Sequence, residues 1–178
     1  MFRNHSIYPC FVLSTLLIAA APTLAAEKIV VVNMINEAGL GKIIGTVKLS
    51  DSTAGLVIEP DLGELTPGKH GFHIHQKPSC EVGEKDGKVG AGLAAGGHFD
   101  PSSTGKHEGP DGHGHAGDLP ALEVNGDGSA TNKLLAPQLK LEQIVGHALM
   151  IHDGSDNYSD SPLPLGGGGR RIACGIIE

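Results

Sequence analysis

Residues 71–75 read GFHIH and place two histidines, His73 and His75, two positions apart. Successive side chains of a β-strand point to opposite faces, so both imidazoles would share one face and Phe72 and Ile74 the other. Such a strand would pack its apolar face into a core and offer two ring nitrogens to a metal on the other face. An isolated His-x-His pair also occurs on plain surfaces, so the other histidines decide between the two interpretations.

Short runs of β-branched residues recur along the chain, and few windows have the period of a helix. Glycine- and proline-rich segments separate these runs, and NGDG at 125–128 predicts a hairpin between ALEV and SATNKLL. The pattern predicts an all-β domain, either a sandwich or a barrel. The expected strands cover residues 28–35, 41–51, 54–60, 70–75, 121–125, 147–152 and 171–177.

Two long segments, 76–120 and 153–170, lack the strand pattern. Long loops of this kind in a compact domain are usually functional or disordered. The first loop is rich in histidine and also carries a cysteine, which favours a loop held by a metal and a disulfide.

The N-terminus has the features of a secretory signal peptide, with Arg3 before an apolar run and small residues after it. Cleavage is expected after Ala25 or Ala26, which leaves a single domain over residues 26–178. The apolar run is short for a membrane span, although a retained anchor is the alternative.

The formal net charge of −7 makes nucleic acid and an anionic membrane surface unsuitable partners. Two of the three cysteines, Cys80 and Cys174, lie beyond the signal peptide. In an oxidising compartment such a pair most simply forms one disulfide.

The other histidines of interest lie mainly in the first long loop, with one more at the end of the apolar run HALMIH. Loop histidines with a nearby carboxylate suit a tetrahedral zinc site. Two strand histidines with a third from a neighbouring strand suit the flatter nitrogen site that Cu(II) prefers. The sequence therefore offers ligands for two metals. These residues are His98, His107, His113, His115, Asp118 and His152.

Six ordered motifs, GFHIH, GGHFDP, GKHEGP, HAGDL, MIHDGSDN and GGRRIACGII, resemble those of secreted bacterial copper/zinc superoxide dismutases. The resemblance covers essentially the whole chain after the signal peptide. It implies a Greek-key β-sandwich or flattened barrel with long metal-binding loops and one disulfide. It also implies copper and zinc cofactors, superoxide as substrate, and antioxidant defence in the periplasm. It implies no nucleic-acid partner and no stable membrane contact, and it leaves a homodimer open.

The resemblance also assigns individual residues. Copper would bind His73, His75, His98 and His152, and zinc would bind His98, His107, His115 and Asp118. His98 would thus bridge the metals and carry a proton during turnover. Arg171 would bind the superoxide anion, Asp156 would link a copper-ligand histidine to a zinc-ligand histidine, and Cys80 would pair with Cys174.

Other readings remain open on the residues alone. A zinc hydrolase like an α-carbonic anhydrase and a cupin both use His-x-His, and a periplasmic metal-buffering protein would need no Arg171. Near Asp118, His115 has the family's spacing, whereas His113 is an extra histidine. His70 and His147 are interpreted as structural, and GGGG at 166–169 as backbone that passes close to the metal channel. Lys85, Lys88 and Lys106 are candidates for steering the substrate.

Overall fold

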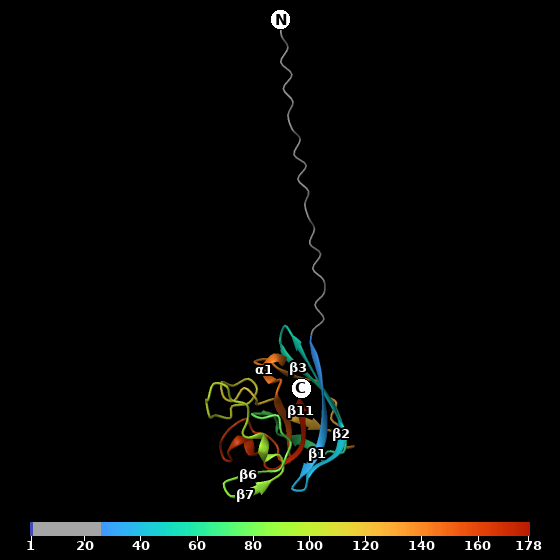
Figure 1. The fold of residues 1–178 in the computed structure, drawn as a ribbon, viewed down its shortest axis with the longest axis vertical. Helices are drawn as coiled ribbons and strands as arrows, with labels where there is room; N and C mark the ends of the chain where they lie inside the picture. The colour runs from blue at the N-terminus through green and yellow to red at the C-terminus, as the bar shows by residue number, and fades with distance from the viewer. Residues whose placement is uncertain (2–25) are drawn as a thin grey trace.

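Most strands form one curled antiparallel sheet that wraps around the core as a half-barrel (Figure 1). The computed structural model describes Met1 and residues 26–178, so the predicted signal peptide lies outside the described residues except for Met1. In spatial order the sheet contains β5 (Phe72–His75), β10 (His147–His152), β11 (Arg171–Ile177), β1 (Glu27–Asn36), β2 (Gly39–Ser52), β3 (Gly55–Leu62) and β9 (Leu134–Ala136).

Two small antiparallel pairs and three short helical turns complete the described fold. The predicted all-β class, in its flattened-barrel form with one disulfide, is confirmed. Within the described residues, no helix is long and apolar enough to cross a membrane. The remaining elements are β4 (Gly68–His70) paired with β8 (Leu122–Val124), β6 (Gly83–Lys85) paired with β7 (Lys88–Gly90), η1 (Leu93–Ala95), α1 (Leu141–Ile144) and η2 (Leu165–Gly167).

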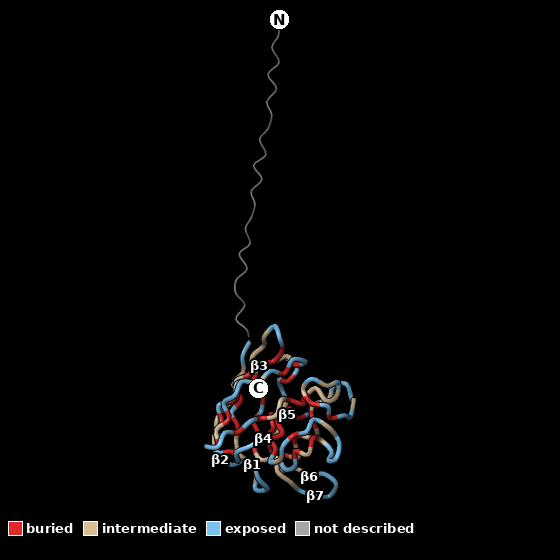
Figure 2. The backbone as a smooth tube through the Cα atoms, turned by 180° about the vertical axis from the view of Figure 1, so that it is seen from behind, coloured by how far each residue is buried: buried red, intermediate tan, exposed pale blue. Residues whose placement is uncertain are grey.

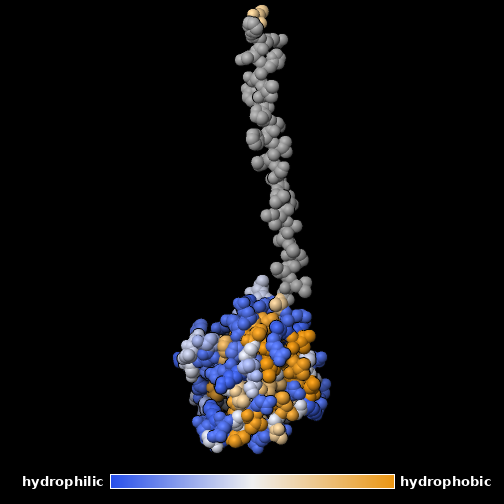
Figure 3. Space-filling model, viewed as in Figure 1, coloured by the Kyte–Doolittle hydropathy of each residue, from blue (hydrophilic) through white to orange (hydrophobic). Residues whose placement is uncertain are grey.

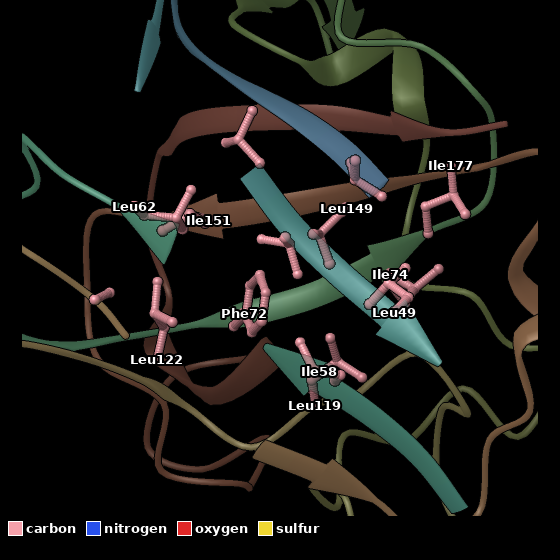
Figure 4. Close-up of a cluster of buried hydrophobic side chains, with 14 of the residues drawn as sticks. Leu49, Ile58, Leu62, Phe72, Ile74, Leu119, Leu122, Leu149, Ile151 and Ile177 are labelled. Atoms are coloured by element: carbon pink, nitrogen blue, oxygen red, sulfur yellow. The ribbon is translucent and has the colours of Figure 1, made fainter. Parts of the chain in front are cut away.

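The main core fills the concave side of the sheet (Figure 4). Phe72 and Ile74 of β5 are fully buried in it, as the alternation of GFHIH predicts. Leu119, near the end of the first long loop, is buried in the same cluster. The apolar face of β5 therefore anchors the strand from behind and fixes the direction of the histidines on its other face.

The outer face of β1 is also apolar, which explains the unbroken run IVVV at 29–32. Val30 and Val32 face the core, whereas Ile29 and Val31 are 64% and 47% exposed. Figure 3 shows apolar residues gathered on this side of the molecule, over β1 and β2. The homodimer that the resemblance leaves open stays a prediction.

The prediction of a hairpin at NGDG is wrong, although the turn itself forms. Gly128 N–H donates to Asn125 O over 3.0 Å, and Asn125 N–H donates to Ser129 O over 2.8 Å. Beyond this turn the two segments separate, because β8 pairs with β4 and β9 pairs with β3. Ala130 forms an isolated bridge with Leu62 of β3. Long-range pairing thus overrides the local hairpin signal.

A hairpin that the strand pattern does not predict lies inside the first long loop. Asp86 and Gly87 join β6 to β7 with φ values of 53° and 75°. Positive φ at both central residues is the mark of a type I′ turn, for which Asp-Gly is well suited. The hairpin projects from the molecule as a mostly exposed ribbon (Figure 2), so its strands are polar and lack the apolar alternation of a core strand.

A disulfide between Cys80 and Cys174 joins the first long loop to β11. It lies in a second, smaller core on the other side of β10 and β11, together with Ile35, Ala148 and Met150. The bond restrains the start of the loop against the sheet.

Replacing both cysteines with alanine should lower the free energy of unfolding by roughly 4 to 5 kcal/mol, because the bond closes a long loop in the unfolded chain. The sequence separation of 94 residues sets this size. Urea denaturation of the variant and of oxidised wild-type protein measures the difference. Reduced wild-type protein is the control and should match the variant; equal stability of oxidised and reduced protein would contradict the prediction.

Candidate metal centre

Neighbouring strands bring three histidines together on the side of the sheet away from the main core. In the register of β5 and β10, His75 lies opposite Ala148 and His73 lies opposite Met150. His152 ends β10. All three histidines are buried.

The first long loop covers the free edge of β5 and delivers the other candidate ligands there. Isolated bridges join His75 to His98 and His73 to Asp118. Ile74 anchors the loop from both sides: its N–H donates to Gly117 O and its carbonyl accepts from Phe99 N–H, each over 2.8 Å. Backbone pairing therefore sets the positions of His98 and Asp118 relative to the strand histidines.

The side chains form two overlapping groups whose possible ligand atoms lie within 4.8 Å of one another. The first group is the predicted copper set, His73, His75, His98 and His152, and the second contains His73, His98, His107 and Asp118. His115 is adjacent to the second group, with its Nδ1 3.4 Å from Asp118 Oδ1. With Asp156, described next, the structure brings together all eight predicted site residues other than Arg171 and the disulfide cysteines.

Asp156 lies between the two groups and bonds to one histidine of each. Its Oδ2 accepts from His73 Nε2 over 2.7 Å, and its Oδ1 accepts from His107 Nε2 over 2.8 Å. Each ring then donates from Nε2 and directs Nδ1 toward the centre, where Nδ1 can bind a metal once it carries no proton. Because His73 has only this one free nitrogen, it can be a ligand in only one of the two groups. His115 is then available as the fourth ligand of the second group.

Backbone carbonyls orient the remaining strand histidines in the same way. His75 Nδ1 donates to Gly96 O over 3.1 Å, and His152 Nδ1 donates to Gly169 O over 3.3 Å. Their Nε2 atoms face each other at 3.4 Å. Each ring is thus held by one nitrogen and leaves the other free for a ligand.

Five buried side-chain atoms in the described part of the chain have no hydrogen-bond partner, and all belong to this centre. Such atoms are costly in a protein interior unless something else satisfies them. Cations bound by nitrogen and carboxylate oxygen would do so, and therefore the donor set fits two metal ions. The five atoms are His73 Nδ1, His98 Nε2, His107 Nδ1, His115 Nδ1 and Asp118 Oδ2, of which His107 Nδ1 and Asp118 Oδ2 lie 2.9 Å apart as an ion pair without hydrogen-bond geometry.

Burial and neighbouring charges divide the histidines electrostatically. Burial, with the charge of His73 second, lowers the pKa of His98 to about 3. Burial also holds the pKa values of His75 and His152 well below the usual range. At His107 burial acts in the same direction, but the adjacent carboxylates of Asp118 and Asp156 outweigh it and raise the pKa to about 9. The strand histidines are therefore neutral and ready to bind a metal, whereas His107 holds a proton.

Arg171, at the start of β11, lines a cavity of about 840 Å³ together with His98 and His152. Its two terminal nitrogens donate to Gly92 O and Gly96 O, each over 2.6 Å. Burial lowers the pKa of Arg171 to about 10, which leaves the guanidinium charged at neutral pH. A fixed cation thus lies beside the open side of the histidine group.

The second long loop folds over the first through contacts that the sequence analysis does not identify. Asp160 accepts from His107 N–H over 2.9 Å and from Leu165 N–H over 3.0 Å. Tyr158 accepts from Ala121 N–H through its hydroxyl over 2.9 Å. The sequence offers no signal for these contacts, because they depend on how two irregular segments meet.

The GGGG segment lies against the centre, as expected from the sequence. A Cβ atom on Gly166 would be 2.0 Å from Asp156 Oδ1 and 2.7 Å from His107 Nε2. Gly166 also has a φ of 68°, which side chains rarely adopt. Only glycine therefore lets Asp156 and His107 approach each other here.

The other histidines have structural positions. His70 bonds to His152 O and Thr66 O, each over 2.7 Å, and His147 Nδ1 donates to His75 O over 3.1 Å. These contacts confirm the structural interpretation of both residues. His113 is exposed, and its backbone N–H donates to Glu108 Oε2 over 3.1 Å. Of the lysines considered for steering, Lys85 lines the cavity and Lys106 lies 3.9 Å from Glu108.

Residues 43–177 match the model of the family described as copper/zinc superoxide dismutase. The chain belongs to the copper/zinc superoxide dismutase family. It is 54% identical to a copper/zinc superoxide dismutase of Escherichia coli K12 over 163 residues, which cover 91% of this chain and 94% of that protein. It is 50% identical to the enzyme of Brucella abortus biovar 1 over 169 residues, covering 94% and 98%.

Solved structures of copper/zinc superoxide dismutases agree with the fold. The structure of the Brucella abortus enzyme has a TM-score of 0.84 at 51% identity and covers 86% of this chain and 100% of that one. The solution structure of the monomeric enzyme from Salmonella enterica has a TM-score of 0.77 at 53% identity, with the same coverage. The chain is thus a superoxide dismutase whose cofactors are copper and zinc and whose substrate is superoxide.

Zinc binding to the metal-free dismutase at pH 7 should release about one proton. The resemblance implies that His107 is a zinc ligand; with a pKa of about 9 it carries a proton that would have to leave Nδ1 before this atom could bind zinc. Protons therefore favour the metal-free form below pH 9. Zinc affinity should rise about tenfold per pH unit from pH 7 to 9 and then level off.

Calorimetry in buffers of different ionisation enthalpy measures the released proton. The exposed His113→Gln variant is the control and should release the same number. Zinc binding without proton release at pH 7, or an affinity that does not change between pH 7 and 9, would contradict a protonated His107.

Proposed function

We propose that this dismutase holds copper and zinc side by side and shares His98 between them. Copper would be bound by His73, His75, His98 and His152, and zinc by His98, His107, His115 and Asp118. The observation that carries this assignment is the set of unpartnered atoms, because each belongs to one of these ligands. The shared position of His98 is supported by its membership of both groups.

His98 has an available nitrogen toward each metal. Its Nδ1 lies 2.8 Å from Asp118 Oδ1, within the proposed zinc group, and its Nε2 has no protein partner. The low pKa of His98 means that Nε2 can exist without a proton in the buried centre. Nε2 would be the atom at which His98 exchanges a proton with the product, once Nδ1 has given up its own proton to a metal and keeps the ring in place.

Copper, when bound, supplies the alternating one-electron oxidation and reduction that converts two superoxide anions and two protons into dioxygen and hydrogen peroxide. Arg171 would bind each anion, since its guanidinium is held by two carbonyls and keeps further N–H donors for an oxygen anion. Asp156 would keep His73 and His107 in their metal-binding tautomers. Arg171 and His98 are therefore the proposed catalytic residues.

We further propose that the enzyme works in the periplasm as an antioxidant, with a signal peptide at 1–25 and a single mature domain at 26–178. The basic, apolar and small-residue pattern at the N-terminus supports export. The Cys80–Cys174 disulfide supports an oxidising compartment.

Superoxide decay should depend on copper, and Arg171→Ala should slow it. Protein loaded with both metals should be fast and protein with zinc alone inactive, as measured by pulse radiolysis. Arg171→Ala should lower kcat/KM by about tenfold or more, because an anion entering the cavity loses its fixed cation. The neighbouring exposed Arg170→Ala is the matched control and should change the rate far less.

Two outcomes would contradict the proposed site. An active His152→Ala variant with unchanged copper content would remove His152 from the copper set. Equal rates for Arg171→Ala and Arg170→Ala would remove Arg171 from substrate binding.

Export should leave a mature protein that begins at Ala26 or Glu27. Mass spectrometry of protein from the periplasmic fraction of a Gram-negative host measures this directly. A charged substitution in the apolar run, Leu16→Arg, should block export and retain the uncleaved chain in the cytoplasm. Cleaved protein with this substitution, or uncleaved wild-type protein at the membrane, would contradict the proposed signal peptide.

A further inference from the structure

The cavity above the histidines is much larger than its substrate requires. Its volume is about 840 Å³, within the range of sites that bind organic molecules. Superoxide has two oxygen atoms and is comparable in size with a water molecule, whose share of liquid volume is about 30 Å³. Most of the cavity is therefore unused by the reaction.

Apolar side chains from two separate segments line the cavity. Val89 and Leu93 come from the region of the β6–β7 hairpin, and Pro164 and Leu165 come from the second long loop. Figure 1 places both segments at the same side of the molecule. Val89 is 63% exposed, so its side chain is available to contact a ligand in the cavity. These walls favour a ligand with an apolar body.

The charges of the lining favour an anion. Lys85, Arg170 and Arg171 line the cavity, against the single carboxylate of Glu37. Arg170 is already paired with Asp153, Nε to Oδ2 over 2.8 Å. Arg171 has five N–H donors, and its hydrogen bonds to Gly92 O and Gly96 O use two of them. Arg171, beside the histidines, therefore offers positive charge to an anion, and Lys85 is a second cation of the lining.

We propose that this cavity binds an amphipathic organic monoanion, a carboxylate with an apolar body of about eight carbon atoms. The carboxylate binds Arg171, and the hydrocarbon lies between Val89 and Leu165. The bound anion closes the route to His98 and His152, so it inhibits the dismutase in competition with superoxide. The inference rests on the proposed role of Arg171.

Octanoate, acetate and 1-octanol are the probes, each tested by calorimetry on protein loaded with copper and zinc. Octanoate should bind at least tenfold more tightly than acetate, because each buried methylene group strengthens binding by about fourfold. It should also bind at least tenfold more tightly than 1-octanol, which lacks the charge. Octanoate should inhibit superoxide decay over the concentration range in which it binds.

Val89→Thr should weaken octanoate binding by about three- to fivefold and leave acetate binding unchanged. Val145→Thr is the matched control, because Val145 is also exposed, at 42%, and lies outside the cavity lining. Both variants should keep the rate of superoxide decay measured without a probe.

Equal binding of octanoate and acetate, equal binding of octanoate and 1-octanol, or equal effects of the two valine variants would each overturn the inference. Octanoate that binds without inhibiting would also overturn it, since the ligand would then lie elsewhere. Failure of the proposed function has a different signature: no copper-dependent superoxide decay, whether or not octanoate binds.

Discussion

The structure depends on a buried cluster of imidazoles and carboxylates that the polypeptide cannot satisfy alone. Asp156 fixes one ring of each metal group, and backbone carbonyls fix the rings of His75 and His152. What remains is a set of lone pairs that point inward and require cations. The two long loops contribute few side chains to the main core, so their attachment to the sheet depends on this polar cluster.

The metal-free cluster already contains a substitute for part of the missing charge. His107 Nδ1 lies 2.9 Å from Asp118 Oδ2, and His107 Nε2 lies 2.8 Å from Asp156 Oδ1. Because its pKa is raised, His107 carries a positive charge that balances these two carboxylates. Zinc at this position replaces one positive charge with two. The protonated His107 therefore joins the carboxylates of the two long loops in the absence of a metal.

The sequence predicts the parts of the fold that depend on local alternation. The directions of His73 and Phe72 follow from the period of a strand, and the runs at 147–152 and 171–177 become β10 and β11 with those bounds. Pairing over long distances is not predictable in this way: the signal at NGDG is a genuine turn, but Ala130 pairs with Leu62 instead of completing a hairpin. The β6–β7 hairpin is missed for the opposite reason, since its turn signal is present but its exposed strands are polar.

The site can be predicted from the sequence where the type of a single residue, such as histidine, already indicates metal binding. Histidines with metal-binding spacing identify two metals, and the resemblance to a family assigns most of their roles. Asp160 and Tyr158 carry no such signal, because their value lies in accepting backbone N–H groups from another loop. The size of the cavity is likewise a property of two loops and a hairpin together, and no single motif encodes it.

The place of β5 at the end of the sheet order has a further consequence. An edge strand exposes unpaired backbone groups that can recruit a strand from another molecule. Here residues 98–119 occupy that edge, with Ile74 bonded to Gly117 and Phe99. The metal-binding loop thus also protects against intermolecular sheet formation, because it bonds to backbone groups that β5 would otherwise expose.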